Sequence, residues 1–213
     1  MIITHYGGEY FKIQTGDIVI AFNPPSKNSK LKAPRFGADV TFVSLNNSNF
    51  NGTENNVYGD KEPLVVSGPG EYEVKEIFIK GFPTGTTYEK ETKINTIYSV
   101  LFDGIKLCFL GALSSADAIT SEIKGEIANH DILFVPIGGA DVLSPSEAGK
   151  VAVSLAPKII IPMHYEGVGE KDALETFLKE EGGDKITPIE KLTIKKKDFD
   201  GKEGEIVVLK SSV

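Results

Sequence analysis

The sequence predicts an α/β fold in which helices cover the outer faces of packed β-sheets. The first half of the 213-residue chain consists of short β-branched and aromatic runs separated by turn signals. In the second half, apolar runs alternate with helical patterns. No linker-like segment divides the chain, and 40% of its residues are hydrophobic, which is enough for one substantial core. We therefore predict a single domain over residues 1–213.

Strands are predicted in the first half wherever a short apolar run ends at a turn signal. Such signals are Gly7 with Gly8, Gly16 with Asp17, and Asp103 with Gly104, the last of which predicts a tight hairpin. A loop is predicted at residues 23–34, which contain three prolines. The predicted strands are residues 2–6, 10–14, 18–22, 40–45, 64–67, 74–80, 96–102 and 105–110.

Helix signals appear only in the second half. Ser144, Pro145 and Glu147 have the spacing of an N-cap, a proline in the first turn and a capping box, which predicts a helix to about Leu155. Two further helices are predicted at residues 117–128 and 170–181, and buried strands at residues 132–136 and 158–162. The chain is predicted to close with a hairpin of residues 191–196 and 205–210.

Composition excludes several classes of protein. The net charge of −7 disfavours duplex nucleic acid and anionic membranes as partners, because both require clustered lysine and arginine. No run approaches the roughly 18 apolar residues of a membrane-spanning helix, and the N-terminal segment lacks the pattern of a secretory signal. One cysteine, Cys108, forms neither an internal disulfide nor a cysteine zinc site, and it is predicted to be a buried thiol. We expect a cytoplasmic protein.

Three histidines are available as metal ligands, and none has the spacing of a zinc motif. His164 follows a predicted strand, at the edge where α/β sheets place functional groups, but a histidine that hydrogen-bonds locally explains it equally. His130 is predicted to be a surface residue. His5 lies in a strand and is free to face either way.

Paired carboxylates occur at Glu71 and Glu73. In an extended segment both side chains point to the same face, as a general acid and base or a pair of oxygen ligands would. A solvated strand face is the other interpretation of the same pattern.

A series of motifs, in order and at specific spacing, resembles the metallo-β-lactamase-fold superfamily. The chain is more similar still to its ascorbate-phosphate-lactonase-like branch of zinc-dependent hydrolases. The resemblance implies a four-layer αββα sandwich of two mixed sheets, with a zinc site at one sheet edge. The motifs are Asn23-Pro24, where the family often has IDP, then GADVTFVS, GPGEYEV, NTIYSVLFDGIKLCFLGAL, VPIGG and IPMHY, the last at residues 161–165.

The zinc ligands implied by the resemblance are largely replaced in this chain. The family's HxHxDH motif matches residues without imidazole or carboxylate groups, its middle histidine falls near residues 83–87, where there is none, and its bridging aspartate corresponds to alanine. Apolar side chains in these positions cannot bind a cation, so we predict no metal and no other cofactor. The residues at the former metal site are Leu45, Asn47, Asn49, Phe50, Ala112 and His164.

Two principal functions remain open, beside a purely structural or assembly role. The first is a non-catalytic pseudoenzyme that binds a small molecule or a protein partner in the old cleft, lined by residues 46–56, 83–93 and 138–143. Polar groups there would be His164, Asp141 and Asn47. The alternative is a lactonase- or phosphodiesterase-like hydrolase with a rebuilt metal-free or single-metal site, in which His164 acts with Asp141, Glu71 or His5. Self-association into a homo-oligomer is open in both cases.

Overall fold

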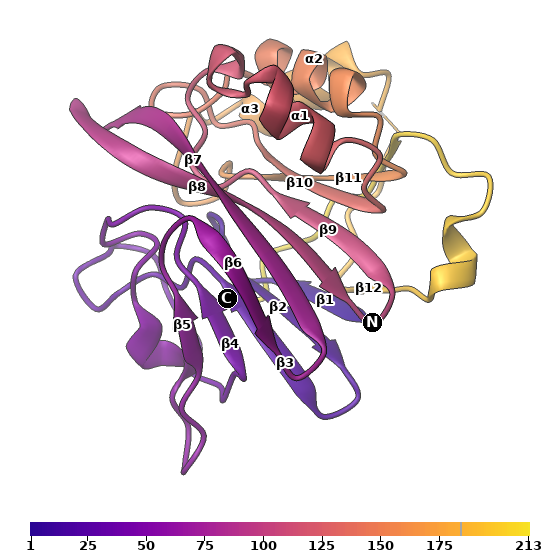
Figure 1. Ribbon diagram of the computed structural model, residues 1–213. Coiled ribbons are helices and arrows are strands. Elements are labelled where there is room, and N and C mark those ends of the chain that lie inside the picture. Colours follow the sequence, from indigo (N-terminus) through magenta and orange to yellow (C-terminus); the bar gives the residue numbers. More distant parts are fainter. Residues whose placement is uncertain (184) are drawn as a thin grey trace.

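Two mixed β-sheets pack face to face in the computed structural model, which describes residues 1–183 and 185–213 (Figure 1). The first sheet has the strand order β12-β1-β2-β3-β4-β5. Strands β1 to β3 are antiparallel, whereas β4 and β5 join in parallel. Its strands are β1 (Ile2–His5), β2 (Phe11–Thr15), β3 (Ile18–Phe22), β4 (Val40–Phe42), β5 (Leu64–Val66) and β12 (Leu192–Thr193).

The second sheet has the order β13-β11-β10-β9-β8-β7-β6. Strands β6 to β9 form an antiparallel meander, and β9, β10, β11 and β13 are parallel. Its strands are β6 (Gly70–Val74), β7 (Ile77–Tyr88), β8 (Glu91–Phe102), β9 (Ile105–Phe109), β10 (Ile132–Pro136), β11 (Ile159–Met163) and β13 (Glu205–Ile206). The predicted fold class, a sandwich of two mixed sheets, is confirmed.

Aromatic side chains fill the space between the two sheets. The ring of Phe22 stacks on Phe42 at a centroid distance of 4.4 Å and on Phe109 of the opposite sheet at 4.5 Å. Phe11 meets Phe134 edge-on at 4.9 Å, and all of these rings are fully buried. Strand alternation explains the arrangement, since every second residue of β2 and β3 points into this core.

The three α-helices of the described residues, α1 (Ser121–Ile127), α2 (Pro145–Leu155) and α3 (Ala173–Glu180), cover the outer face of the second sheet (Figure 1). The predicted capping box of α2 is present: Ser144 Oγ accepts from Glu147 N at 3.3 Å, and Ser144 N donates to Glu147 Oε2 at 3.0 Å. The outer face of the first sheet is covered instead by irregular chain, in which Phe36 packs on Tyr10. Short 3₁₀ helices occur at Thr53–Asn56, Ala116–Ala118 and Lys196–Phe199.

Four local predictions were wrong. The single strand predicted at residues 74–80 instead spans the turn between β6 and β7, where Lys75 and Glu76 have positive φ. The predicted terminal hairpin does not form: β12 pairs with β1, and β13 pairs with β11 of the other sheet. Residues 83–93 are not a loop but the end of the long β7–β8 hairpin, which turns at Glu89 and Lys90. Residues 117–128 split into a 3₁₀ turn and α1, because Thr120 caps the helix by accepting from Ile123 N. In the described part of the chain, no helix has the length and apolar character needed to span a membrane.

Candidate functional site

His164 lies directly after β11, in the left-handed backbone conformation with φ of 63°. Its backbone N donates to Gly8 O at 2.8 Å, which ties it to the turn between β1 and β2. Its Nδ1 lies 2.7 Å from Glu9 Oε1. The side chains of His164 and Glu9 are 2% and 0% exposed, so this imidazole–carboxylate pair is sealed from solvent. His164 is thus hydrogen-bonded within the protein, as one of the two interpretations of the sequence expects, but its partner lies 155 positions away in the chain rather than nearby.

Both oxygens of Glu9 have a partner. Asn23 Nδ2 donates to Glu9 Oε2 at 2.6 Å and to Ser44 Oγ at 2.7 Å. Asn23 Oδ1 in turn accepts from Ser44 N at 2.8 Å. This buried network links the first turn, the end of β3 and the segment after β4 to His164, so each buried polar group is satisfied as burial demands. We call Glu9, Asn23, Ser44 and His164 the polar network.

An apolar cluster covers the polar network. Phe50 and Tyr88 meet edge-on at a centroid distance of 5.2 Å, and each ring lies 6.0 Å from the imidazole of His164. The cluster has five side chains, and each is at most 4% exposed. The space beside the imidazole of His164 is thus packed with side chains. The apolar cluster consists of Leu45, Phe50, Tyr88, Ala112 and Val142.

Asn47 and Asn49 hold the neighbouring loops together. Asn47 Nδ2 donates to Glu89 Oε2 at 2.7 Å, at the tip of the β7–β8 hairpin. Asn49 Nδ2 donates to the Tyr88 hydroxyl at 3.3 Å, and Asn49 Oδ1 accepts from Ser29 Oγ at 2.6 Å. Both asparagine side chains therefore hydrogen-bond to other side chains of this protein, at positions where the resemblance implies metal ligands.

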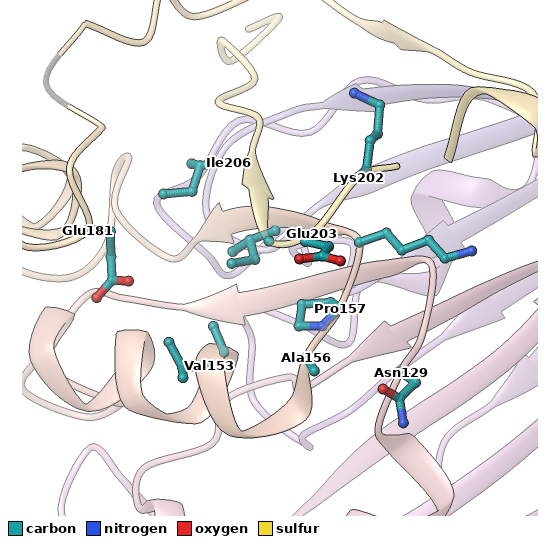
Figure 2. A pocket seen from close by; sticks show the side chains of 12 residues that line it. Asn129, Val153, Ala156, Pro157, Glu181, Lys202, Glu203 and Ile206 are labelled. Atoms are coloured by element: carbon teal, nitrogen blue, oxygen red, sulfur yellow. The ribbon is translucent and has the colours of Figure 1, made fainter. Parts of the chain in front are cut away.

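The segment of residues 24–34 closes the outside of the site. Leu31 packs so tightly over Gly8 and Gly167 that a Cβ on either glycine would lie 2.9 Å or 2.5 Å from a Leu31 methyl carbon. Ser26 N donates to Ser48 O at 2.7 Å, which fixes the segment to the loop after β4. The cavity drawn in Figure 2 is elsewhere, lined by Lys158 and Ile160 at the start of β11, the opposite end of the strand from His164.

The other residues singled out in the sequence lie at different distances from the polar network. His5 is fully buried beside it, with Nε2 3.3 Å from Gly8 O and its ring stacked on Phe11. Burial lowers the pKa of His5 to about 4. Asp141 follows β10 and is half-buried. Its charge acts on Tyr88, whose pKa is raised, chiefly by burial.

Glu71 is not brought to the site. It lies on β6 at one edge of the second sheet, whereas His164 follows β11 near the opposite edge. Its side chain is 79% exposed and lies 3.7 Å from Lys80 Nζ. The extended segment does put Glu71 and Glu73 on one face, and that face is solvated.

His130 and Cys108 are both buried. His130 is 4% exposed rather than on the surface, because its Nε2 lies 2.7 Å from Ser99 Oγ and its Nδ1 lies 3.3 Å from Ala128 O. Cys108 is fully buried, as predicted, and burial raises the pKa of its thiol. Sequence reasoning missed Glu9, because no motif or spacing connects it with His164, which lies 155 positions away in the chain.

Residues 2–164 match the profile of a family described as the beta-lactamase superfamily domain. The chain belongs to this family. The resemblance to this superfamily inferred from the motifs is confirmed.

Relatives of the chain are named as hydrolases. A UPF0173 metal-dependent hydrolase of Lysinibacillus sphaericus is 26% identical over 195 residues, covering 78% of this chain and 85% of the relative. A UPF0173 protein of Pyrococcus furiosus is 38% identical over 81 residues, which span only 36% of its own length. A Thermotoga maritima structure, assigned to the zinc-dependent hydrolases of the metallo-β-lactamase superfamily, superposes with a TM-score of 0.76 at 29% identity, covering 98% of this chain and 97% of that one.

The residues present do not fit the zinc that the family implies. A catalytic zinc needs about three nitrogen, sulfur or oxygen ligands and an open position for water. Leu45, Phe50 and Ala112 have no donor atom in their side chains, so His164, whose Nδ1 faces Glu9, would contribute a single imidazole ligand. Within residues 1–183 and 185–213, no group of three or more His, Cys, Asp or Glu side chains comes together as a metal site.

Proposed function

We propose that this protein is a non-catalytic member of the metallo-β-lactamase family, a pseudoenzyme that binds a small molecule or a protein partner. One observation carries the proposal. Where the resemblance implies a metal centre, Phe50 and Tyr88 lie against His164, and His164 and Glu9 are both buried. A metal-dependent hydrolase needs a bound water as its nucleophile and a cation to polarise the substrate, and this packing provides for neither.

A hydrolase built around His164 is the competing function. Its acid–base pair would be His164 with Glu9 rather than with Asp141, Glu71 or His5, because only Glu9 is within hydrogen-bond distance. A general base has to reach a proton of its substrate directly or through one water. Since Phe50, Tyr88 and Leu31 close the approach to the His164–Glu9 pair, a substrate would first have to displace these side chains. The packing therefore favours the binding role, and it favours binding outside the former cleft.

The decisive measurement is the metal content of tag-free protein after incubation with excess zinc and removal of unbound ions. We expect far less than one zinc per chain, and an unchanged content in the His164→Gln variant. Near-stoichiometric zinc that is lost in His164→Gln would contradict the proposal.

A second assay tests whether the protein catalyses hydrolysis without a metal. Lactone, phosphodiester and thioester substrates should show no turnover above that of His164→Gln, which retains a polar side chain for Glu9. Turnover that disappears in this variant would establish the hydrolase instead.

We also propose a cytoplasmic location, supported by the single, fully buried cysteine, which suits a reducing compartment. Fractionation of cells that express the chain tests this, and recovery outside the cytoplasmic fraction would contradict it.

A further inference from the structure

A serine and a histidine are hydrogen-bonded to each other on the outer face of the second sheet, away from the polar network. Ser99 Oγ, on β8, lies 2.7 Å from Nε2 of His130, in the turn before β10. The Nδ1 atom of the same ring lies 3.3 Å from Ala128 O. Because a carbonyl oxygen can only accept, Nδ1 carries the ring proton, and Nε2 accepts the hydrogen of the Ser99 hydroxyl. In this arrangement a histidine can act as the general base of a nucleophilic serine.

Burial keeps the base uncharged while the hydroxyl remains accessible. His130 is 4% exposed, and burial lowers the pKa of its imidazole, so the ring is free to take up a proton at neutral pH. Ser99 is partly exposed. Its neighbours across the sheet are Lys80, which is exposed, and Cys108, which is buried beneath the helices. The hydroxyl therefore lies where the helical layer ends and solvent begins.

Exposed apolar surface adjoins Ser99. Phe78 and Leu101 are paired across β7 and β8 on the same face as Ser99, and Leu101 is about 7 Å further along β8. Phe78 is 48% exposed, although most phenylalanines of the chain are buried. Among the described residues, the helices leave this end of β7 and β8 uncovered (Figure 1). Both side chains also line a hollow of about 350 Å³, so an apolar chain attached to Ser99 has room to remove them from water.

We propose that Ser99 is a modification site at which His130 activates the hydroxyl to accept a short apolar acyl group from an activated ester. The Ser99 oxygen forms a bond to the carbonyl carbon, and the bond from that carbon to the leaving group breaks. The hydroxyl proton passes to His130 Nε2 and from there to the departing oxygen. The acyl chain then covers Phe78 and Leu101. Transfer of one acyl group per chain is a covalent modification without turnover, so the proposal is independent of the pseudoenzyme assignment.

The probe is p-nitrophenyl hexanoate, and intact-mass measurement with peptide mapping follows the reaction. We expect one hexanoyl group per chain, attached to Ser99. Incorporation should be at least about tenfold slower in Ser99→Ala and in His130→Gln, because a positioned general base accelerates such a step by roughly 10²–10⁴-fold. Ser154 is the internal control and should stay unmodified, because it is exposed but its Oγ donates to Val151 O.

Chain length tests the apolar surface. Phe78→Ser should slow the reaction with p-nitrophenyl hexanoate severalfold and leave the reaction with p-nitrophenyl acetate unchanged, since an acetyl group is too short to reach this ring. Ile94→Ser is the matched control, because it removes another exposed apolar side chain of β8, near the tip of the hairpin. It should react with both esters as the parent chain does.

A further variant tests the pair without removing the buried histidine. Iodoacetamide should alkylate the new thiol of Ser99→Cys severalfold faster than that of Ser154→Cys, because a neighbouring imidazole favours the thiolate. The native thiol of Cys108 is fully buried. Hexanoyl groups on lysines only, equal rates in the parent and Ser99→Ala, or a folded His130→Gln variant that reacts as fast as the parent would each overturn the proposal. So would equal alkylation of the two cysteine variants, or no effect of Phe78→Ser.

Discussion

At the scale of single residues, Glu9 connects the turn between β1 and β2 to His164. Its Oε1 lies 2.7 Å from His164 Nδ1. Asn23, where the resemblance implies an aspartate, donates from Nδ2 to Glu9 Oε2 at 2.6 Å. Both oxygens of this buried carboxyl group are therefore hydrogen-bonded within the protein.

Replacing Glu9 by leucine should destabilise the protein by about 3 kcal/mol, because His164 Nδ1 loses its partner inside the protein and Asn23 keeps only one of its two acceptors. Glu9→Gln should cost about 1 kcal/mol or less, since an amide can bond to both neighbours. Urea unfolding of the two variants and the parent chain measures the difference. A leucine variant as stable as the parent would show that the polar network contributes nothing to stability.

His5 gives the protein a predictable sensitivity to acid. Burial lowers its pKa to about 4 in the folded state, whereas the unfolded chain has the ordinary pKa near 6.5. Between these values the unfolded state binds a proton that the folded state does not, so the free energy of unfolding falls as the pH drops. We expect a loss of up to about 3 kcal/mol from this residue between about pH 6.5 and about pH 4.

Urea unfolding of His5→Gln across that range is the measurement. In the variant, the free energy of unfolding should depend less steeply on pH, because the contribution of His5 is gone. The contribution of His130, whose pKa is also lowered by burial, should remain. The same pH dependence in the variant and the parent would exclude His5 as its source.

At the scale of elements, short sequence patterns correctly predicted the features that depend on a few neighbouring residues. The strand of residues 18–22 and α2 with its capping box occur where the sequence indicates them, because turn and cap chemistry act over a few residues. The tight turn at Asp103 and Gly104 also forms, with positive φ at both residues. Strands β12 and β13 were misread as partners, because a two-residue strand does not indicate whether it extends a hairpin or the edge of a distant sheet.

The candidate site was predicted only in part, for the same reason. The motifs brought Leu45, Phe50, Ala112 and His164 to one position, and they do gather there. Tyr88 was missed because it belongs to a strand that was predicted to be a loop. An open cleft was expected, but the contact between Phe50 and Tyr88 depends on the length of the β7–β8 hairpin, which no local pattern specifies.

At the scale of the whole molecule, the C-terminal segment completes both sheets of the sandwich. Strand β12 extends the first sheet next to β1, and β13 extends the second sheet next to β11. Ile194, Phe199 and Leu209, between and after these strands, are at most 3% exposed and belong to the core between the sheets. We therefore propose that residues 1–213 form a single domain.

Deleting residues 185–213 should abolish cooperative folding. Each of those three core side chains contributes about 1.5–3 kcal/mol by its burial, and their sum is comparable to the roughly 5–15 kcal/mol that stabilises a whole domain. Far-UV circular dichroism and urea unfolding measure the effect, and a chain that lacks only Val213, which is 50% exposed, is the control. A truncated chain with a normal unfolding transition would show that the last segment is a separate unit.

By itself, the sequence determined the α/β class, the caps and turns, and the family, because each of these depends on residue types at short spacing. Only the tertiary structure decided that Glu9 would meet His164, that Phe50 and Tyr88 would pack against this histidine, and that β12 and β13 would join different sheets. The physical reason is that these features are contacts between segments far apart in the chain, set by how two sheets pack rather than by any local preference.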